Sequence, residues 1–152
     1  MKMQRLQGAP DECAHEVLDV VPLAMRVIRK KLREHATQTL SLPQFRTLGF
    51  ISRNEGASLS EVADHIGLTL PSMSALVDGL VTRHFVIRST HQDDRRRMDL
   101  TLTERGETTL QSARKEAQED LKKRFADLTE QERITLVRGM KIMRRVFSDG
   151  DA

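Results

Sequence analysis

Residues 58–83 read SLSEVADHIGLTLPSMSALVDGLVTR and contain two short helix signatures joined by a tight turn. Ser58 is followed three residues later by a glutamate, the spacing of a capping box. Gly67 is a natural helix stop, because glycine adopts the left-handed conformation without steric cost. Thr69 can cap the next helix, with Pro71 in its first turn, where a missing N–H costs little. This pattern predicts a helix-turn-helix, whose second helix can enter a major groove.

A third capped helix precedes this pair. Ser41 and Gln44 have the capping-box spacing, Pro43 lies in the first turn, and Gly56 is expected to end the helix. Each of the three helices carries an apolar stripe, so the sequence predicts one shared core. The stripes consist of Phe45, Leu48 and Ile51, then Val62, Ala63 and Ile66, and finally Met73, Leu76, Val77 and Leu80.

The periodicity changes from helical to alternating after the third helix. Apolar and polar side chains alternate in residues 97–102, which is typical of a half-buried strand. Residues 85–89 are the expected partner strand, and the polar segment 91–97 between them is the expected tip of a hairpin. Three helices followed by a hairpin predict a winged helix-turn-helix lobe in residues 41–103.

Long helices are expected on both sides of this lobe. Apolar residues recur at three- and four-residue steps in residues 13–38, although Pro22 predicts a kink or a break. Residues 104–148 show the same periodicity, with a capping box that starts at Thr129. Three short helices cannot cover these stripes, so both regions are expected to be dimerisation helices. Residues 1–12 are expected to form a flexible arm.

The expected fold class is therefore mainly α-helical with one small antiparallel β-hairpin. Composition narrows the function. The 152-residue chain has a net charge of +3 and a pI near 9.3, which favours a polyanionic partner. Aromatic residues make up only 3%, so stacking platforms for single-stranded nucleic acid are not expected. No apolar run is long enough for a membrane span, and the single cysteine cannot form an internal disulfide, so a cytoplasmic protein is expected.

The second helix of the helix-turn-helix offers small polar side chains opposite its apolar stripe. Candidates for contact with base edges or phosphates are Ser72, Met73, Ser74 and Asp78. An ordinary solvated helix face explains the same pattern equally well.

The hairpin tip carries a more specific signal. Arg95, Arg96 and Arg97 would repel one another in isolation, but beside DNA they meet phosphates or a narrow minor groove. Asp94 is expected to hold an arginine in position through a bidentate ion pair. A solvated charge run is the alternative, and the position of the arginines after three capped helices favours double-stranded DNA.

Three segments resemble the MarR-type regulators: LSLPQFRTLGFI (40–51), LSEVADHIGLTLPSMSALVDGLVTR (59–83) and DDRRRMDLTLTERG (93–106). The resemblance covers nearly the whole chain, and Asp-Arg-Arg followed by LTERG is its most distinctive part. It implies a homodimer with a recognition helix at about residues 70–82 in the major groove and Arg96 in the minor groove. It also implies repression at a palindromic operator and release by a small-molecule effector.

Three positions depart from the family pattern. His84 stands where a glycine commonly closes the recognition helix, so the turn into the wing is expected to differ. Ala75 and Gly79 replace residues that are commonly basic, so phosphate contacts must come from elsewhere. The candidates for those contacts are Arg46, Arg53, Arg83 and Arg88.

The sequence places an effector pocket only loosely. Met25, Arg29 and Phe45 are candidates for its lining, because an apolar cleft with one cation suits a small aromatic or anionic compound. Packing of Met25 and Phe45 in the core explains these residues at least as well.

Other functional classes have less support. Cys13 is a candidate redox sensor, but the resemblance pairs such a cysteine with tyrosines, which the chain lacks. The five histidines lack metal-ligand spacing, so neither a metal nor another cofactor is expected. The chain has no phosphate loop and no nucleophile elbow, so an enzyme is not expected. A protein-interaction module with a solvated basic tip is the remaining alternative.

Overall fold

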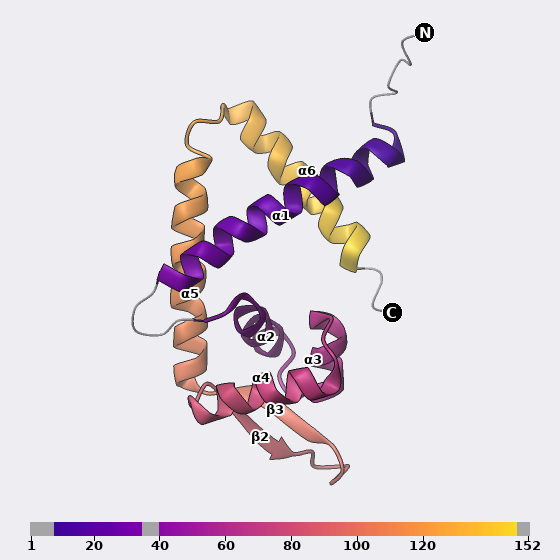
Figure 1. Cartoon of the computed structure of the whole chain (residues 1–152), viewed down its shortest axis with the longest axis vertical. Helices are drawn as coiled ribbons and strands as arrows, with labels where there is room; N and C mark the ends of the chain where they lie inside the picture. Colours follow the sequence, from indigo (N-terminus) through magenta and orange to yellow (C-terminus); the bar gives the residue numbers. More distant parts are fainter. Residues whose placement is uncertain (1–7, 35–39, 149–152) are drawn as a thin grey trace. The chain divides into compact units, whose positions relative to one another are not determined.

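The computed structural model of the chain describes residues 8–34 and 40–148, which form six helices and three short strands (Figure 1). Two compact units divide the chain within α5, after Ala117. The expected fold class is confirmed. The elements are α1 (Pro10–Glu34), α2 (Leu42–Arg53), β1 (Ala57–Ser58), α3 (Leu59–Ile66), α4 (Leu70–Thr82), β2 (Val86–Thr90), β3 (Met98–Leu102), α5 (Glu104–Arg124) and α6 (Glu130–Ser148).

The predicted helix starts are confirmed at α2, α3 and α4. Ser41 and Ser58 each form a complete capping box, and Thr69 accepts a hydrogen bond from the backbone N–H three residues on. Gly67 ends α3 in a left-handed conformation with φ of 79°. These short-range contacts set the lengths of the helices that carry the site.

Two helix boundaries differ from the prediction. α1 begins at Pro10, inside the expected arm, and continues through Pro22 as one helix, so of the predicted kink or break the break is wrong. Because proline has no N–H, the one backbone hydrogen bond that it removes is the bond to the carbonyl of Leu18, four residues earlier. Leu18 is 73% exposed, so water can replace this bond. α2 ends at Arg53 with Asn54 as its C-cap, earlier than Gly56. Residues 35–38 of the predicted first helix lie outside the described residues.

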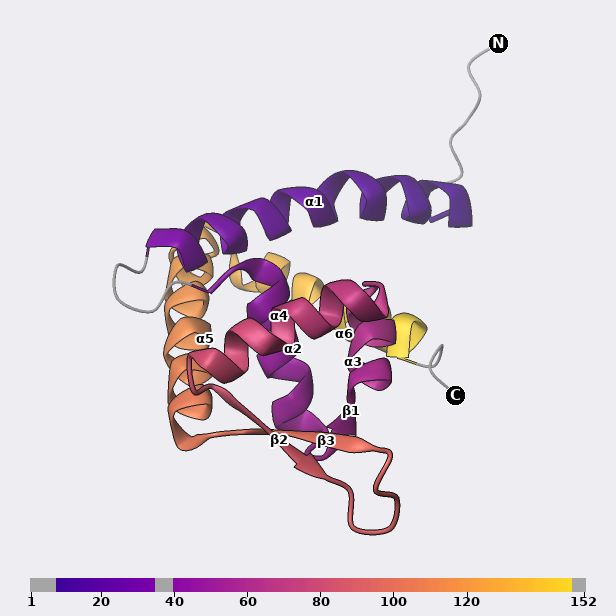
Figure 2. The same cartoon turned by 60° about the horizontal axis from the view of Figure 1, so that its bottom comes forward.

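The wing is a three-stranded antiparallel sheet in the order β1-β3-β2. β2 and β3 form the predicted hairpin, with its tip at residues 91–97, and the hairpin extends away from the helices (Figure 2). β1 was not predicted, because two residues show no alternation. It pairs Ala57 with Leu100 and so ties the segment before α3 to the wing.

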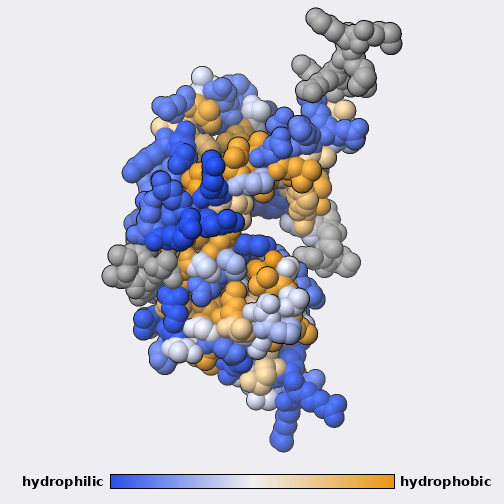
Figure 3. Space-filling model, in the orientation of Figure 1, coloured by the Kyte–Doolittle hydropathy of each residue, from blue (hydrophilic) through white to orange (hydrophobic). Residues whose placement is uncertain are grey.

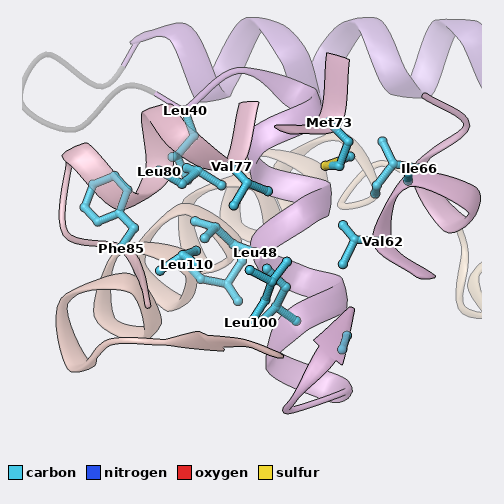
Figure 4. Packing of buried hydrophobic residues seen from close by; sticks show 14 residues of the cluster. Leu40, Leu48, Val62, Ile66, Met73, Val77, Leu80, Phe85, Leu100 and Leu110 are labelled. Atoms are coloured by element: carbon cyan, nitrogen blue, oxygen red, sulfur yellow. The ribbon is translucent and has the colours of Figure 1, made fainter. Parts of the chain in front are cut away.

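One apolar core joins α2, α3, α4, the sheet and the start of α5 (Figure 4). The predicted stripes supply most of it, and Leu48, Val62, Met73, Val77 and Leu80 are all completely buried. Phe45 and Leu76 pack against its edge. The core therefore holds the helix-turn-helix and the wing in one rigid arrangement.

α4 ends in a Schellman motif that turns the chain into the wing. His84 is left-handed with φ of 59°, its N–H donates to the Val81 carbonyl, and the N–H of Phe85 donates to the Leu80 carbonyl, both at 2.9 Å. The expectation that histidine would change this turn is wrong. Two backbone hydrogen bonds and the burial of Phe85 hold the left-handed residue despite its Cβ.

α5 begins against this turn. The Thr103 hydroxyl donates to the His84 carbonyl (2.6 Å) and accepts from the N–H of Gly106 (2.9 Å). Gly106 lies so close to Phe85 that a Cβ at this position would stand well under 3.0 Å from the Phe85 carbonyl oxygen. The LTERG sequence thus ends β3, caps α5 and fixes α5 against the start of the wing.

The second unit contains the end of α5 and α6. α6 buries none of its residues and exposes apolar side chains over a broad face, with Val137 at 53% and Met140 at 50%. α1, in the first unit, likewise exposes Leu18, Val20 and Leu23. None of the described helices is long and apolar enough to cross a bilayer.

Candidate nucleic-acid interface

α4 presents the predicted polar face to solvent. Ser72 and Asp78 are exposed, and Ser74 is half-buried. The Ser72 hydroxyl accepts from the Thr69 hydroxyl (2.9 Å), so it also takes part in the cap of α4. Ser72 and Asp78 are therefore accessible to a partner, and their contact with DNA stays a prediction.

Met73 does not belong to this face. It is 0% exposed, and its sulfur accepts from the buried Thr47 hydroxyl at 4.0 Å. Its assignment as a base-contacting residue is therefore wrong. The physical reason is helical periodicity, since position 73 shares its face with Val77 and Leu80, four and seven residues later.

Two predicted DNA contacts, Asp78 and Arg88, are paired with each other. One guanidinium nitrogen of Arg88 on β2 lies 2.8 Å from the Asp78 carboxylate and 3.5 Å from the Ser74 carbonyl oxygen, both on α4. The pair is partly exposed, with 31% of the Arg88 side chain and 59% of the Asp78 side chain accessible. It ties the wing to the recognition helix and also reduces the local positive charge.

Asp94 orders the hairpin tip through the backbone. Its carboxylate accepts from the Arg96 N–H (2.9 Å), and its carbonyl accepts from the Arg97 N–H (3.0 Å), which is an Asx-turn arrangement. Asp94 forms no ion pair with an arginine among the described residues, so the expected bidentate pair is wrong. A carboxylate two residues before the arginine reaches the nearer backbone N–H first.

Arg95 and Arg96 project from this ordered tip. Both are exposed, and neither side chain has a hydrogen bond or ion pair within the described part of the chain. The tip stands out as a hydrophilic projection on the space-filling surface (Figure 3). Both guanidinium groups are therefore available to an anionic partner.

Arg97 has a different environment from its two neighbours. Its guanidinium donates to the Gly56 carbonyl (3.1 Å), to Glu61 on α3 (3.3 Å) and to Asp99 (3.2 Å). Asp99 is also hydrogen-bonded to His91 at 2.7 Å. Arg97 was predicted to contact DNA, but its side chain holds the tip end of β3 against the start of α3.

A shallow groove of about 400 Å³ lies between the start of α3, α4 and the wing. Its lining includes the hydroxyl residues Ser58, Ser60 and Ser74 and the cations Arg88 and Arg96. Hydroxyl and guanidinium donors together suit a phosphate oxygen. Sequence reasoning missed Ser58 and Ser60, because nothing local shows that the start of α3 lies beside the wing.

Of the remaining basic candidates, Arg83 and Arg46 contact other parts of the protein. The Arg83 guanidinium lies over the Phe85 ring, 4.6 Å from its centroid. Arg46 donates to the Ile66 carbonyl at 3.4 Å. Burial and the nearby Arg114 lower the pKa of Arg53. The guanidinium groups of Arg83 and Arg46 are thus already used in contacts within the protein, which makes them weaker candidates for phosphate contacts than Arg95 and Arg96.

The effector candidates are only partly brought together. A cavity of about 700 Å³ lies between the end of α1 and the start of α2, and its cations are Arg29, Arg33 and Arg46. Met25 and Phe45 do not line this cavity. Phe45 instead packs against the core, which was the alternative interpretation from the sequence. Sequence reasoning missed Arg33, which follows Arg29 at the four-residue spacing of one helix face.

Cys13 is exposed on α1. Within residues 8–34 and 40–148, no three His, Cys, Asp or Glu side chains gather as a metal site.

Asp99 is expected to make stability depend on acid pH. The hydrogen bond from His91 is the largest cause that lowers the pKa of Asp99 below its ordinary value of 3.8, and Arg97 lowers it further, while burial acts in the opposite direction. A carboxyl with a lowered folded-state pKa stabilises the fold above the unfolded-state pKa, and this stability is lost as pH falls through the folded-state value. Urea unfolding of Asp99→Asn should therefore show a weaker dependence on pH below about pH 5 than the wild type does.

The control is Asp93→Asn, which removes an exposed carboxyl from the same hairpin. It should retain the wild-type pH dependence. If all three proteins lose stability equally as the pH falls, the contacts of Asp99 with His91 and Arg97 do not govern the acid sensitivity of the fold.

The sequence is similar to known transcriptional regulators. The model of the MarR family matches residues 38–97. Two HTH-type transcriptional regulators of Bacillus subtilis, YpoP and YfiV, are 29% and 26% identical over 110 residues. That span is 72% of this chain, 78% of YpoP and 69% of YfiV.

Solved structures share the fold. RV1404 from Mycobacterium tuberculosis matches with a TM-score of 0.80 at 22% identity, over 95% of this chain and 97% of that one. Wild-type MarR from E. coli matches with a TM-score of 0.76 at 21% identity, over 86% and 95%. The transcriptional repressor CouR, bound to a 23-mer DNA duplex, matches with a TM-score of 0.68 at 24% identity, over 87% and 94%.

Proposed function

We propose that the chain is a DNA-binding transcriptional regulator of the MarR type, and that it is a homodimeric repressor that an anionic effector releases from a palindromic operator. The exposed side chains of Arg95 and Arg96, on a tip ordered by Asp94, carry the DNA-binding part of this proposal. Unpaired arginines on an ordered tip suit a minor groove, whose potential attracts them.

The groove between α3, α4 and the wing supports a path for the DNA backbone. Its serine hydroxyls and arginines face the space between the recognition helix and the tip. A phosphate held there would leave the exposed face of α4 directed at the major groove and Arg96 directed at the adjacent minor groove.

The exposed apolar faces of α1 and α6 support a homodimer. The apolar face of an amphipathic helix is normally buried against another element, and α6 buries none of its residues within one chain. A second copy would cover such faces symmetrically and place two recognition helices on one side of the duplex. The half-sites would then lie about 10–10.5 base pairs apart, centre to centre, or a multiple of that spacing.

The cavity beside Arg29, Arg33 and Arg46 supports an anionic effector. Three cations that line one cavity favour a carboxylate or phenolate there. Because coupling is reciprocal, DNA must weaken effector binding by the same factor by which the effector weakens DNA binding. Calorimetry with and without operator, using a panel of aromatic acids, tests this step.

The DNA-binding proposal is tested by fluorescence anisotropy with duplexes from the region just upstream of the gene. Specific binding to an inverted repeat is expected, and the observed affinity should fall steeply as salt rises. A shallow salt dependence on every duplex would contradict the proposed interface.

Arg96→Ala and Arg97→Ala should have different effects. Arg96→Ala is expected to weaken operator binding by about 1–3 kcal/mol and to make the salt slope shallower by about one, with little change in Tm. Arg97→Ala should lower the Tm, because Glu61, Asp99 and the Gly56 carbonyl lose a shared donor. Anisotropy and thermal unfolding on both variants make the comparison.

Asp94→Ala provides the control on the order of the tip. If only net charge matters, removal of the Asp94 carboxylate should tighten operator binding. If the Asx turn of Asp94 positions Arg96, Asp94→Ala should weaken operator binding. Unchanged binding by Arg96→Ala together with tighter binding by Asp94→Ala would contradict the wing assignment.

A further inference from the structure

Two arginines from different helices meet on the surface of the first unit. The side chains of Arg53 on α2 and Arg114 on α5 converge over Gly49, where a Cβ would lie 3.6 Å from a terminal nitrogen of Arg53 and 3.3 Å from one of Arg114. The absence of a side chain at Gly49 leaves room for both guanidinium groups. Arg53 is exposed and Arg114 is half-buried, so solvent reaches the pair.

No acid neutralises this pair among the described residues. Neither arginine has an acidic residue three or four positions away on its own helix, the spacing at which helical ion pairs form. Glu107 accepts from the Ser52 hydroxyl (3.0 Å) and from the Gln111 amide (2.6 Å), and no ion pair joins it to either arginine among the described residues. Burial and the charge of Arg114 lower the pKa of Arg53, which is the sign expected of two unneutralised cations.

We propose that Arg53 and Arg114 form a binding site for a small phosphate-type oxyanion, made by α2 and α5 and not by α4 and the wing. Like charges held close together cost free energy, and an anion shared between them removes that cost. Two planar guanidinium groups from two directions can each donate to different oxygens of one tetrahedral anion. The site joins α2 to α5, so an occupant would stabilise the contact between these two helices.

Thermal unfolding of the full chain tests this site, with inorganic phosphate titrated against chloride at constant ionic strength. Wild-type Tm should rise with phosphate, because a ligand that binds only the folded state stabilises it. Arg53→Gln and Arg114→Gln should each raise the Tm in chloride, by removing the repulsion, and should lose the response to phosphate. Calorimetry should show phosphate binding at least about tenfold weaker in either variant, the loss of one charge-assisted contact.

Lys115→Gln is the matched control, since it removes one charge from the residue next to Arg114 on the same helix. It should respond to phosphate as the wild type does. An equal Tm rise in chloride and phosphate would overturn the site. A lower Tm of Arg53→Gln in chloride would also overturn it, because another part of the protein would then neutralise the pair.

The DNA backbone is the other source of phosphate, and operator binding by Arg53→Gln distinguishes the two. A wild-type salt slope supports a site for a free anion. A slope shallower by about one would assign Arg53 to a DNA phosphate and overturn the proposal.

Discussion

Gly106→Ala should destabilise the winged-helix unit by about 3 kcal/mol or more, the largest effect expected of an added Cβ at any of the described glycines. The added Cβ would lie well under 3.0 Å from the carbonyl oxygen of Phe85. Because the clash is with a backbone atom of Phe85, no side-chain rotation can relieve it. Chemical unfolding followed by circular dichroism measures the loss.

The backbone that Gly106 approaches is held from several sides. The Phe85 carbonyl accepts from the Thr103 N–H (3.1 Å), the Thr103 hydroxyl donates to the His84 carbonyl (2.6 Å), and the Phe85 ring is 0% exposed. Relief of the clash would therefore move the start of the wing, and DNA binding by the surviving folded fraction should weaken as well.

Gly79→Ala is the matched control. Gly79 lies inside α4, and a Cβ there would meet nothing within 4 Å. Alanine should stabilise this helix by roughly 0.5–1 kcal/mol through its higher helix propensity. Equal effects of the two substitutions would show that the close approach at Gly106 does not govern stability.

Val137→Glu combined with Met140→Glu should convert the proposed homodimer into a monomer and weaken operator binding by at least about 100-fold. Both residues are about half exposed on α6 within one chain, and a partner copy would bury them. A carboxylate buried at such an interface without a partner is strongly unfavourable. A monomer engages only one half-site, so the gain from linked binding is lost. Light scattering and anisotropy measure the two effects.

Arg138→Glu is the control for charge, because it changes the net charge of α6 by the same amount at a polar position between the two. It should remain dimeric. A dimeric Val137→Glu, Met140→Glu variant with wild-type affinity would falsify the proposal that α6 forms the dimer interface.

Local sequence patterns alone determined the order of the helices and of the hairpin strands, the starts of the short helices and the end of α3. The capping boxes at Ser41 and Ser58, the stop at Gly67 and the hairpin tip at residues 91–97 all depend on contacts between residues a few positions apart. Such contacts form wherever the residues stand at the right spacing, so they can be recognised without the rest of the fold.

Tertiary structure alone decided which candidate residues are available to DNA. Three consecutive arginines are equivalent in the sequence, but Arg97 reaches the Gly56 carbonyl and Glu61, which lie 41 and 36 positions away, whereas Arg96 does not. In the same way, Arg88 finds Asp78 across the boundary between wing and helix. The physical reason is that a charged side chain binds the nearest complementary group in space. Which group is nearest depends on how the core packs α3, α4 and the wing together.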